Sequence, residues 1–325
     1  MKMNKLFIIP VAIMSLLASC KGGSASKNTY ELAYELNEDK VSYAVTGITY
    51  SNLSESALYD VVIPDTYNNL PITALGKQGS ANIFYNDKLV KSVKMSNNIK
   101  KCIGKYPFNK CDNLEKITLS ENLEEVDEGG LILSCNKLTE LKLPETLLTL
   151  TEDFVRFTGI KKLILPKNLE LVPHNCFSQN FSLKEVVWPE VDFKIMWTGF
   201  TYCGFEELIM PDNMIIEYGL GPGQFGANDK LTKVVCGKGV SNNEAMFGHC
   251  PNLVEFYMNK ETTSMCYYGG EGYNSSFHHC DSLREIHYES TMEDFNKVKK
   301  EPDWYKSSCH IERVICSDGT IVNEF

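Results

Sequence analysis

The sequence predicts a leucine-rich-repeat solenoid, with one short parallel β-strand per repeat of 22–30 residues, mostly irregular or short helical returns, and a cap at each end. The first observation is a recurring L-x-x-L-x-L pattern, seen as LEKITLS at residues 114–120, LTELKLP at 138–144 and LKEVVWP at 183–189. The second is that phenylalanine and cysteine recur at fixed distances before this pattern. Each unit leaves an apolar face that only its neighbour can bury, so the repeats must stack into one array.

The repeats begin near residue 81 and continue towards the C-terminus. When the first apolar residue of each unit is taken as its anchor, successive anchors lie 22 to 30 residues apart. The anchors are Val90, Leu114, Leu138, Ile160, Leu183, Phe205, Leu231, Leu253, Leu283 and Ile311. Residues 81–325 are therefore predicted to be the array with its C-terminal cap, in which residues 292–304 form a short helix-like interruption.

Residues 31–80 precede the regular repeats and are predicted to form an N-terminal β cap. Residues 41–47 alternate apolar and polar side chains as a strand does, and 61–64 is a second apolar run closed by proline. The first repeat of a stack has no neighbour on one side, so a preceding segment must cover its apolar face.

The N-terminus has the features of a bacterial lipoprotein signal. Residues 1–5 are basic, and residues 6–17 form an apolar run too short for an ordinary membrane span. The LASC sequence at 17–20 resembles the lipobox, in which the cysteine is acylated and becomes the first residue of the mature chain. Residues 1–19 are therefore predicted to be a signal peptide. The alternative is an ordinary secretory signal that happens to contain a cysteine.

Cys20 is the predicted lipidation site, through which the protein is attached to a membrane. Residues 20–30 are rich in Gly, Ser and Lys and are predicted to form a flexible tether. In lipoproteins of this type an Asp after the cysteine favours retention at the inner membrane. Lys21 stands there instead, which indicates export to the outer membrane or cell surface.

The composition is that of a folded, acidic protein. Hydrophobic residues make up 43% and charged residues 23% of the chain, which disfavours disorder. The formal net charge is −10, and it becomes −12 without residues 1–19, which contain two lysines and no acids. Nucleic-acid binding depends on basic patches, so nucleic acid is not an expected partner.

Two further columns fall into register when the repeats are stacked on their anchors. Six residues before the anchor stand Phe84, Phe108, Ile132, Phe154, Phe177, Phe225, Phe247 and Phe277. This column predicts an aromatic spine, interrupted where Gly199 takes the position. Three residues before the anchor stand Asp87, Cys111, Cys135, Asn180, Asn228, Cys250 and Cys280. Asn and Cys at such a turn satisfy buried backbone groups, so these cysteines are predicted to point inward and serve packing.

The repeat unit F-x-x-C-x-x-L-x-x-I-x-L-P resembles the leucine-rich repeat of the BspA-like family of bacterial surface proteins. Residues 42–76 are similar to the first unit of that family, residues 288–321 are similar to its last, and the likeness spans residues 40–322. The long unit at 259–280 departs from the pattern. The resemblance implies attachment at the cell surface and binding of host or neighbouring-cell proteins, without catalysis.

One outward-facing column of the predicted sheet is apolar. Side chains alternate along a strand, so the second and fourth residues after each anchor should point to solvent. The fourth residue is apolar through five consecutive repeats, which we term the apolar stripe: Ile164, Val187, Ile209, Val235 and Tyr257. An exposed apolar patch of this kind often marks a protein-binding surface. The alternative is that β-branched residues simply suit strands and that nearby loops cover them.

The loop at residues 262–276 is a second candidate surface. It carries Tyr267, Tyr268 and Tyr273 among glycines. Tyrosine with glycine is effective contact chemistry, because large amphipathic rings sit on an adaptable backbone. An ordinary surface loop is the alternative.

Eleven cysteines remain beside Cys20, and in an exported protein they first suggest disulfides. Several occupy the turn column, however, so mostly free, buried thiols are expected. The HC pair at 249–250 and the HHC run at 278–280 lie one unit apart and could stack into a Cys/His metal cluster. Both cysteines already belong to the turn column, and we therefore predict neither a metal site nor a cofactor.

The sequence predicts no enzymatic activity. It contains no phosphate-binding loop, nucleophile elbow, zinc-protease helix or dinucleotide-binding fingerprint. The function predicted is that of an adhesin-like surface protein that binds an extracellular or cell-surface protein of host or microbial origin. One alternative is a glycan-binding or polysaccharide-handling lipoprotein, in which aromatic residues such as Trp188, Trp197, Tyr267 and Tyr268 would line one groove. The other is a structural spacer at the cell surface.

Overall fold

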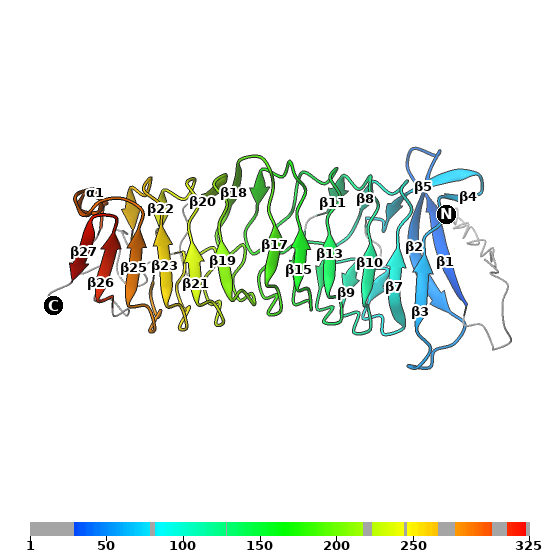
Figure 1. Ribbon diagram of the computed structural model, residues 1–325. Helices are drawn as coiled ribbons and strands as arrows, with labels where there is room; N and C mark the ends of the chain where they lie inside the picture. The colour runs from blue at the N-terminus through cyan, green and yellow to red at the C-terminus, as the bar shows by residue number, and fades with distance from the viewer. Residues whose placement is uncertain are drawn as a thin grey trace, which may run out of the picture.

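The structure, a computed structural model, describes residues 29–78, 82–127, 129–216, 223–243, 246–265, 277–300 and 311–322. The chain winds into an elongated solenoid of stacked coils, with β1 and β2 at one end and β26 and β27 at the other (Figure 1). Neighbouring repeats pair through parallel ladders. The predicted leucine-rich-repeat solenoid is confirmed.

The strands that follow the anchors form the first face of the rod, seen as a row of parallel arrows in Figure 1. They are β3 (Tyr59–Val62), β7 (Val90–Lys94), β10 (Lys116–Thr118), β13 (Glu140–Lys142), β15 (Lys162–Ile164), β17 (Glu185–Val187), β19 (Glu207–Ile209), β21 (Lys233–Val235), β23 (Glu255–Met258), β25 (Glu285–Tyr288) and β26 (Arg313–Cys316). Side chains alternate between core and solvent, as the exposed–buried–exposed pattern of β13 and β19 shows.

The returns contain strands as well, which the sequence did not predict. The second face consists of β2 (Tyr43–Tyr50), β5 (Leu70–Leu75), β8 (Lys101–Cys102), β11 (Glu125–Val126), β16 (Leu171–Val172), β18 (Phe193–Ile195), β20 (Met214–Ile216), β22 (Asn242–Asn243) and β24 (Ser264–Met265). A third group, β6 (Phe84–Tyr85), β9 (Phe108–Asn109), β12 (Ile132–Leu133) and β14 (Val155–Arg156), forms one parallel sheet. Extended segments stacked at the repeat spacing form such short ladders wherever they lie in register.

Antiparallel strands flank the parallel ladders at both ends. β1 (Tyr30–Leu36) pairs antiparallel with β2, and β27 (Gly319–Val322) pairs antiparallel with β26. The hairpin strand β4 (Thr66–Tyr67) pairs with β5. These additions cover strand edges that would otherwise be open to pairing with another chain. Near the C-terminus the helix α1 (Met292–Lys297) buries Phe295, and it begins at the N-cap Thr291, whose side chain accepts from Asp294 N. This helix lies in the first part of the short helix-like interruption predicted at residues 292–304, of which 301–304 lie outside the described residues.

The phenylalanine spine is present and continues through the position where a break was predicted. Phe200 lies stacked between Phe177 and Phe225, with ring centroids 5.3 Å and 5.7 Å apart. The prediction that Gly199 interrupts the spine was wrong, because the turn between spine and anchor Phe205 is one residue shorter in this repeat. The same shortening occurs two repeats earlier, where Val155 rather than Phe154 pairs in register with Ile132 of the third group of strands.

The turn column forms a ladder of hydrogen bonds that joins each repeat to the one before it. Its side chains donate to the carbonyl of the spine residue one repeat earlier. The pairs are Cys111 Sγ to Phe84 O (2.9 Å), Cys135 Sγ to Phe108 O (3.6 Å), Asn180 Nδ2 to Val155 O (2.9 Å), Cys203 Sγ to Phe177 O (3.4 Å), Asn228 Nδ2 to Phe200 O (3.1 Å), Cys250 Sγ to Phe225 O (3.5 Å) and Cys280 Sγ to Phe247 O (3.1 Å). All nine cysteines in the described ranges are buried, as expected for inward-facing packing residues.

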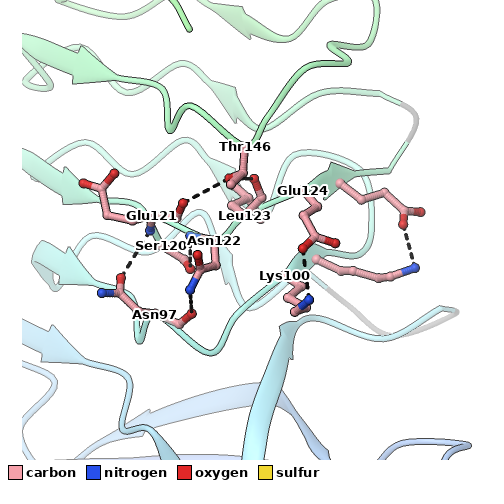
Figure 2. A network of polar contacts seen from close by, with 10 residues as sticks. Asn97, Lys100, Ser120, Glu121, Asn122, Leu123, Glu124 and Thr146 are labelled. Carbon is pink, nitrogen blue, oxygen red and sulfur yellow. Dashed lines mark hydrogen bonds and ion pairs between the residues drawn. The ribbon is translucent and has the colours of Figure 1, made fainter. Parts of the chain in front are cut away.

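A second set of polar contacts links successive turns at the end of the first face (Figure 2). Asn122 Nδ2 donates to Asn97 O (2.9 Å), and Glu121 N donates to Asn97 Oδ1 (3.2 Å). In the next repeat Thr146 Oγ1 donates to Glu121 O (3.0 Å) and to Leu123 O (2.7 Å). Because each turn satisfies backbone groups of its predecessor, the turns hold the strands of the first face at a fixed stagger.

Candidate functional site

The apolar stripe lies on the solvent side of the first face, one residue from each of β15, β17, β19, β21 and β23. Ile209 is 67% exposed and Val187 is 41% exposed, while Ile164, Val235 and Tyr257 are half-buried. In the parallel ladders Ile164 pairs with Val187. In the same way Ile209 pairs with Val235, and Val235 pairs with Tyr257. Between β17 and β19 the backbone is joined by Gly204 N, which donates to Leu183 O (2.9 Å). The stripe therefore consists of two runs of neighbouring side chains on one face, Ile164 with Val187 and Ile209 with Val235 and Tyr257, carried by consecutive repeats.

The column continues beyond the predicted stripe. Tyr257 is followed in register by His287 of β25, and His287 by Ile315 of β26. The Tyr257 and His287 rings are stacked, with centroids 4.3 Å apart and planes inclined by 16°. The stripe predicted from the sequence ends at Tyr257, and the next residue of the column is a histidine. The stacked ring shows that this histidine presents a flat surface to the column.

A pocket of about 510 Å³ adjoins this end of the stripe. It is lined by Val235, Tyr257, His287 and Ile315 of the column, together with residues that follow the strands β21, β23, β25 and β26. This pocket could not be predicted from the sequence, because its walls come from strand and turn residues of several repeats that meet only when the repeats are stacked. Concave sites with apolar walls and a few polar groups are the usual form of a binding site.

Charged groups line the same pocket. Lys238 Nζ lies 2.7 Å from an Asp212 carboxylate oxygen. The hydrogen bonds from Lys238 lower the pKa of Asp212, and the pKa of Lys238 is raised by the same contact. Glu289 lines the pocket as well. In such a pocket the apolar base can make hydrophobic contacts with a bound molecule, and the fixed charges at the edge can orient that molecule.

The other outward column of the first face is charged, and neighbouring strands pair its charges. Lys162 Nζ lies 2.5 Å from Glu185, and Lys233 Nζ lies 3.7 Å from Glu255. Lys233 also lies over the Tyr257 ring, 5.2 Å from its centroid. Tyr257 in turn donates to Glu255 (3.0 Å), a hydrogen bond that raises the pKa of the tyrosine. The charged column thus runs alongside the stripe and fixes the orientation of its largest side chain.

The pocket does not assemble an activated nucleophile. Cys316 lines it together with His287, but burial raises the pKa of the Cys316 thiol. A catalytic cysteine requires the opposite shift, because the thiolate is the reactive form. The Cys316 thiol is therefore not activated as a nucleophile in this pocket.

The two tryptophans proposed for a glycan groove, Trp188 and Trp197, do not line this pocket. Trp188 packs against Phe193 and Phe200, with centroids 5.9 Å and 5.3 Å away, and Trp197 packs against His174 at 6.0 Å. Both tryptophans are half-buried by these contacts. The other predicted binding and lipidation residues, Tyr267, Tyr268, Tyr273 and Cys20, lie outside the described residues.

Comparison with protein families gives one match. The BspA type leucine rich repeat region matches in six copies, over residues 77–206, 151–271 and 193–301, which together span more than half of the chain. The chain belongs to the BspA-type leucine-rich-repeat family. This confirms the resemblance drawn from the repeat unit, and it agrees with the Phe spine and Cys/Asn ladder of the structure.

One solved structure shows the same fold at low sequence identity, and two further leucine-rich-repeat structures are matched with lower TM-scores. A leucine-rich repeat protein from Bacteroides ovatus is 17% identical with a TM-score of 0.61, over 88% of this BspA-type chain and 75% of that chain. A leucine rich cell surface protein from Faecalibacterium prausnitzii is 14% identical with a TM-score of 0.32, over 88% and 100%. The leucine rich repeat protein of T. pallidum is 18% identical with a TM-score of 0.38, over 51% and 83%. A search of curated proteins finds no match.

Among the described residues, no helix has the length and apolar character needed to cross a membrane.

Proposed function

We propose that this BspA-type protein is a lipid-anchored, cell-surface binding protein that captures another protein on its first face, through the apolar stripe and the adjoining pocket. It performs no reaction. The partner is an extracellular or cell-surface protein with an apolar patch flanked by polar and charged groups.

The observation that carries this proposal is the exposure of the stripe. Ile209 is 67% exposed at the centre of a regular strand face, and the next three residues of its column line the pocket. A solenoid needs apolar residues only in its interior, and charged side chains fill the neighbouring outward column. Contiguous apolar surface rimmed by polar groups is typical of protein-interaction sites.

Anchoring is supported by the sequence of the N-terminus. The apolar run at residues 6–17 is followed by the lipobox-like LASC, so acylation of Cys20 would hold the rod at the membrane by its N-terminal end. The tether at 20–30 would leave the first face accessible. Surface binding is also what membership of the BspA-type family favours, although a shared fold alone does not determine function.

A capture experiment tests the proposal. The folded chain without residues 1–19 is immobilised and presented with extracellular-matrix proteins, serum proteins and cell-surface glycans as separate pools. Ile209→Asp places a charge in the middle of the stripe, and Leu171→Asp is the matched control, because Leu171 is an exposed strand residue (42%) on the second face. Neither change removes a buried contact, so both variants should keep the circular dichroism spectrum of the parent.

We expect a protein to be captured by the parent and by Leu171→Asp, and its capture to fall at least about tenfold with Ile209→Asp, since a buried unpaired charge costs more than 1.4 kcal/mol. Capture that is equal in the two variants would contradict the placement of the site on the stripe. Capture of glycans alone would favour the glycan-binding alternative. Absence of capture from every pool would favour the structural spacer.

A further inference from the structure

Three histidines from two consecutive repeats form a cluster away from the apolar stripe. The ligand-capable ring nitrogens of His249, His278 and His279 all lie within 4.8 Å of one another. The ring centroids of His249 are 5.3 Å from those of His278 and 4.8 Å from those of His279, and the latter two are 4.0 Å apart. His249 and His279 are exposed, and His278 is half-buried.

The solenoid itself brings these rings together. His249 and His279 each directly precede a ladder cysteine, Cys250 and Cys280, so they occupy the same position in successive repeats. Both have left-handed backbone conformations, with φ of 63° and 57°. Equivalent positions of neighbouring paired strands lie about 4.8 Å apart, and the centroids of the His249 and His279 rings are separated by the same distance. The backbone is joined here as well, because His249 N donates to His278 O (2.6 Å).

The backbone at this position is left-handed in other repeats too, and the turn accepts several types of side chain there. Asn86, Lys110, Ser134 and Gln179 stand there with φ between 54° and 62°. Histidine on two neighbouring repeats, with a third beside it, is therefore not required by the backbone. Both cysteines donate to carbonyls in the ladder, so the ligand atoms that this cluster offers are the imidazole nitrogens.

We propose that His249, His278 and His279 bind one divalent transition-metal ion, with Zn²⁺ as the preferred class. Zinc binds imidazole nitrogen at about 2.0–2.1 Å, which places two nitrogens of a tetrahedral site about 3.4 Å apart. Rotation of the exposed side chains must therefore close a gap of at most about 1.4 Å. Three imidazoles without a carboxylate disfavour Ca²⁺ and Mg²⁺, which take oxygen ligands. The fourth position faces solvent and takes water or a group of a partner.

The ion would tie two consecutive repeats together next to the long unit at 259–280. This role is independent of the proposed capture of a protein on the first face.

The test is a calorimetric titration of the full chain, purified without a histidine tag, with ZnCl₂ and in parallel with MgCl₂. The variants are His249→Asn and His279→Asn, since asparagine suits a left-handed position and occupies it at Asn86. His174→Asn is the matched control, because it removes a histidine outside the cluster. We expect one equivalent of Zn²⁺, no response to Mg²⁺, and affinity at least about tenfold weaker in both cluster variants but unchanged in the control.

Equal affinity in the cluster variants and the parent, or a chain without saturable Zn²⁺ binding, would overturn the proposal. A second measurement does not depend on the folding of variants. Diethylpyrocarbonate modifies accessible imidazoles, and Zn²⁺ should protect His249, His278 and His279 in the parent chain while leaving His174 reactive. Protection that is absent or equal at all four histidines contradicts the site.

Discussion

At the residue scale, the choice between Asn and Cys in the ladder follows from the length of the preceding turn. Thr158 and Cys203 belong to the repeats with the shorter turn, and their backbone N–H groups donate to Asn180 Oδ1 (3.0 Å) and Asn228 Oδ1 (2.7 Å) of the following repeat. A cysteine is a weak donor and a weak acceptor, whereas the amide of Asn both donates and accepts strongly. Asparagine therefore stands in the ladder where an additional buried N–H must be satisfied.

Glycine completes these short turns. A Cβ at Gly159 would lie 2.1 Å from Asn136 O, and one at Gly204 would lie 2.5 Å from Phe181 O. Neither distance is possible for a real side chain, so the chain passes too close to the preceding repeat for any other residue. The T-G-I and C-G-F sequences before the anchors were visible in the sequence. These sequences mark the repeats in which the spine residue lies one residue closer to the anchor. With that variable spacing, the spine would have been predicted to continue without a break at Gly199.

A substitution series tests the role of the asparagines. Asn180→Ala leaves Thr158 N and the carbonyl group of Val155 without the Asn180 amide, and each such buried group costs about 1–3 kcal/mol, while the Phe177 carbonyl keeps only the weak donor Cys203 Sγ. We expect the free energy of unfolding to fall by about 3 kcal/mol or more. Cys135→Ala, the matched control, removes one weak donor and should cost about 1 kcal/mol. Urea unfolding followed by circular dichroism gives both values, and equal losses would contradict this account.

At the element scale, the period of the sequence was sufficient to place the strands of the first face and the direction of their side chains. Leu141 and Leu208 point inward and Ile209 points outward, as alternation from the anchors predicted. The strands of the second and third faces were not predictable, because two or three extended residues carry no period of their own. Their pairing is a consequence of stacking and not of local sequence preference.

The candidate site divides in the same way. The apolar stripe is a property of strand register and could be predicted from spacing alone. The pocket and the histidine cluster depend on how turns of different length meet across repeats. The sequence placed the histidines one unit apart, but it also suggested that cysteine would be part of any metal site. The structure assigns both cysteines to the ladder and brings the imidazoles together without them.

At the scale of the whole molecule, the fold is a rod that displays one long face. The core is continuous from Val45 to Cys316, so each repeat is stabilised by its neighbours and the array is expected to behave as one unit. A lipid at Cys20 would attach this rod at its N-terminal end. The stripe and pocket lie in its central and C-terminal repeats, towards the end opposite β1 (Figure 1).

Attachment can be tested separately from binding. Cys20→Ser removes the thiol to which the lipid would be attached, and we expect the protein to move from the membrane fraction to the soluble or secreted fraction of the producing bacterium. Lys21→Ser changes the neighbouring residue without removing the thiol and serves as the control. Membrane association of the Cys20→Ser protein equal to that of the parent would show that the cysteine is not the anchor.

The most direct test of the central claim is hydroxyl-radical footprinting of the chain alone and in complex with a captured protein. The method reads the solvent exposure of individual side chains. The account predicts reduced oxidation of Val187, Ile209 and Tyr257 in the complex, with Leu171 on the second face unchanged. Protection of Leu171 with continued oxidation of Ile209 would contradict the assignment of binding to the first face.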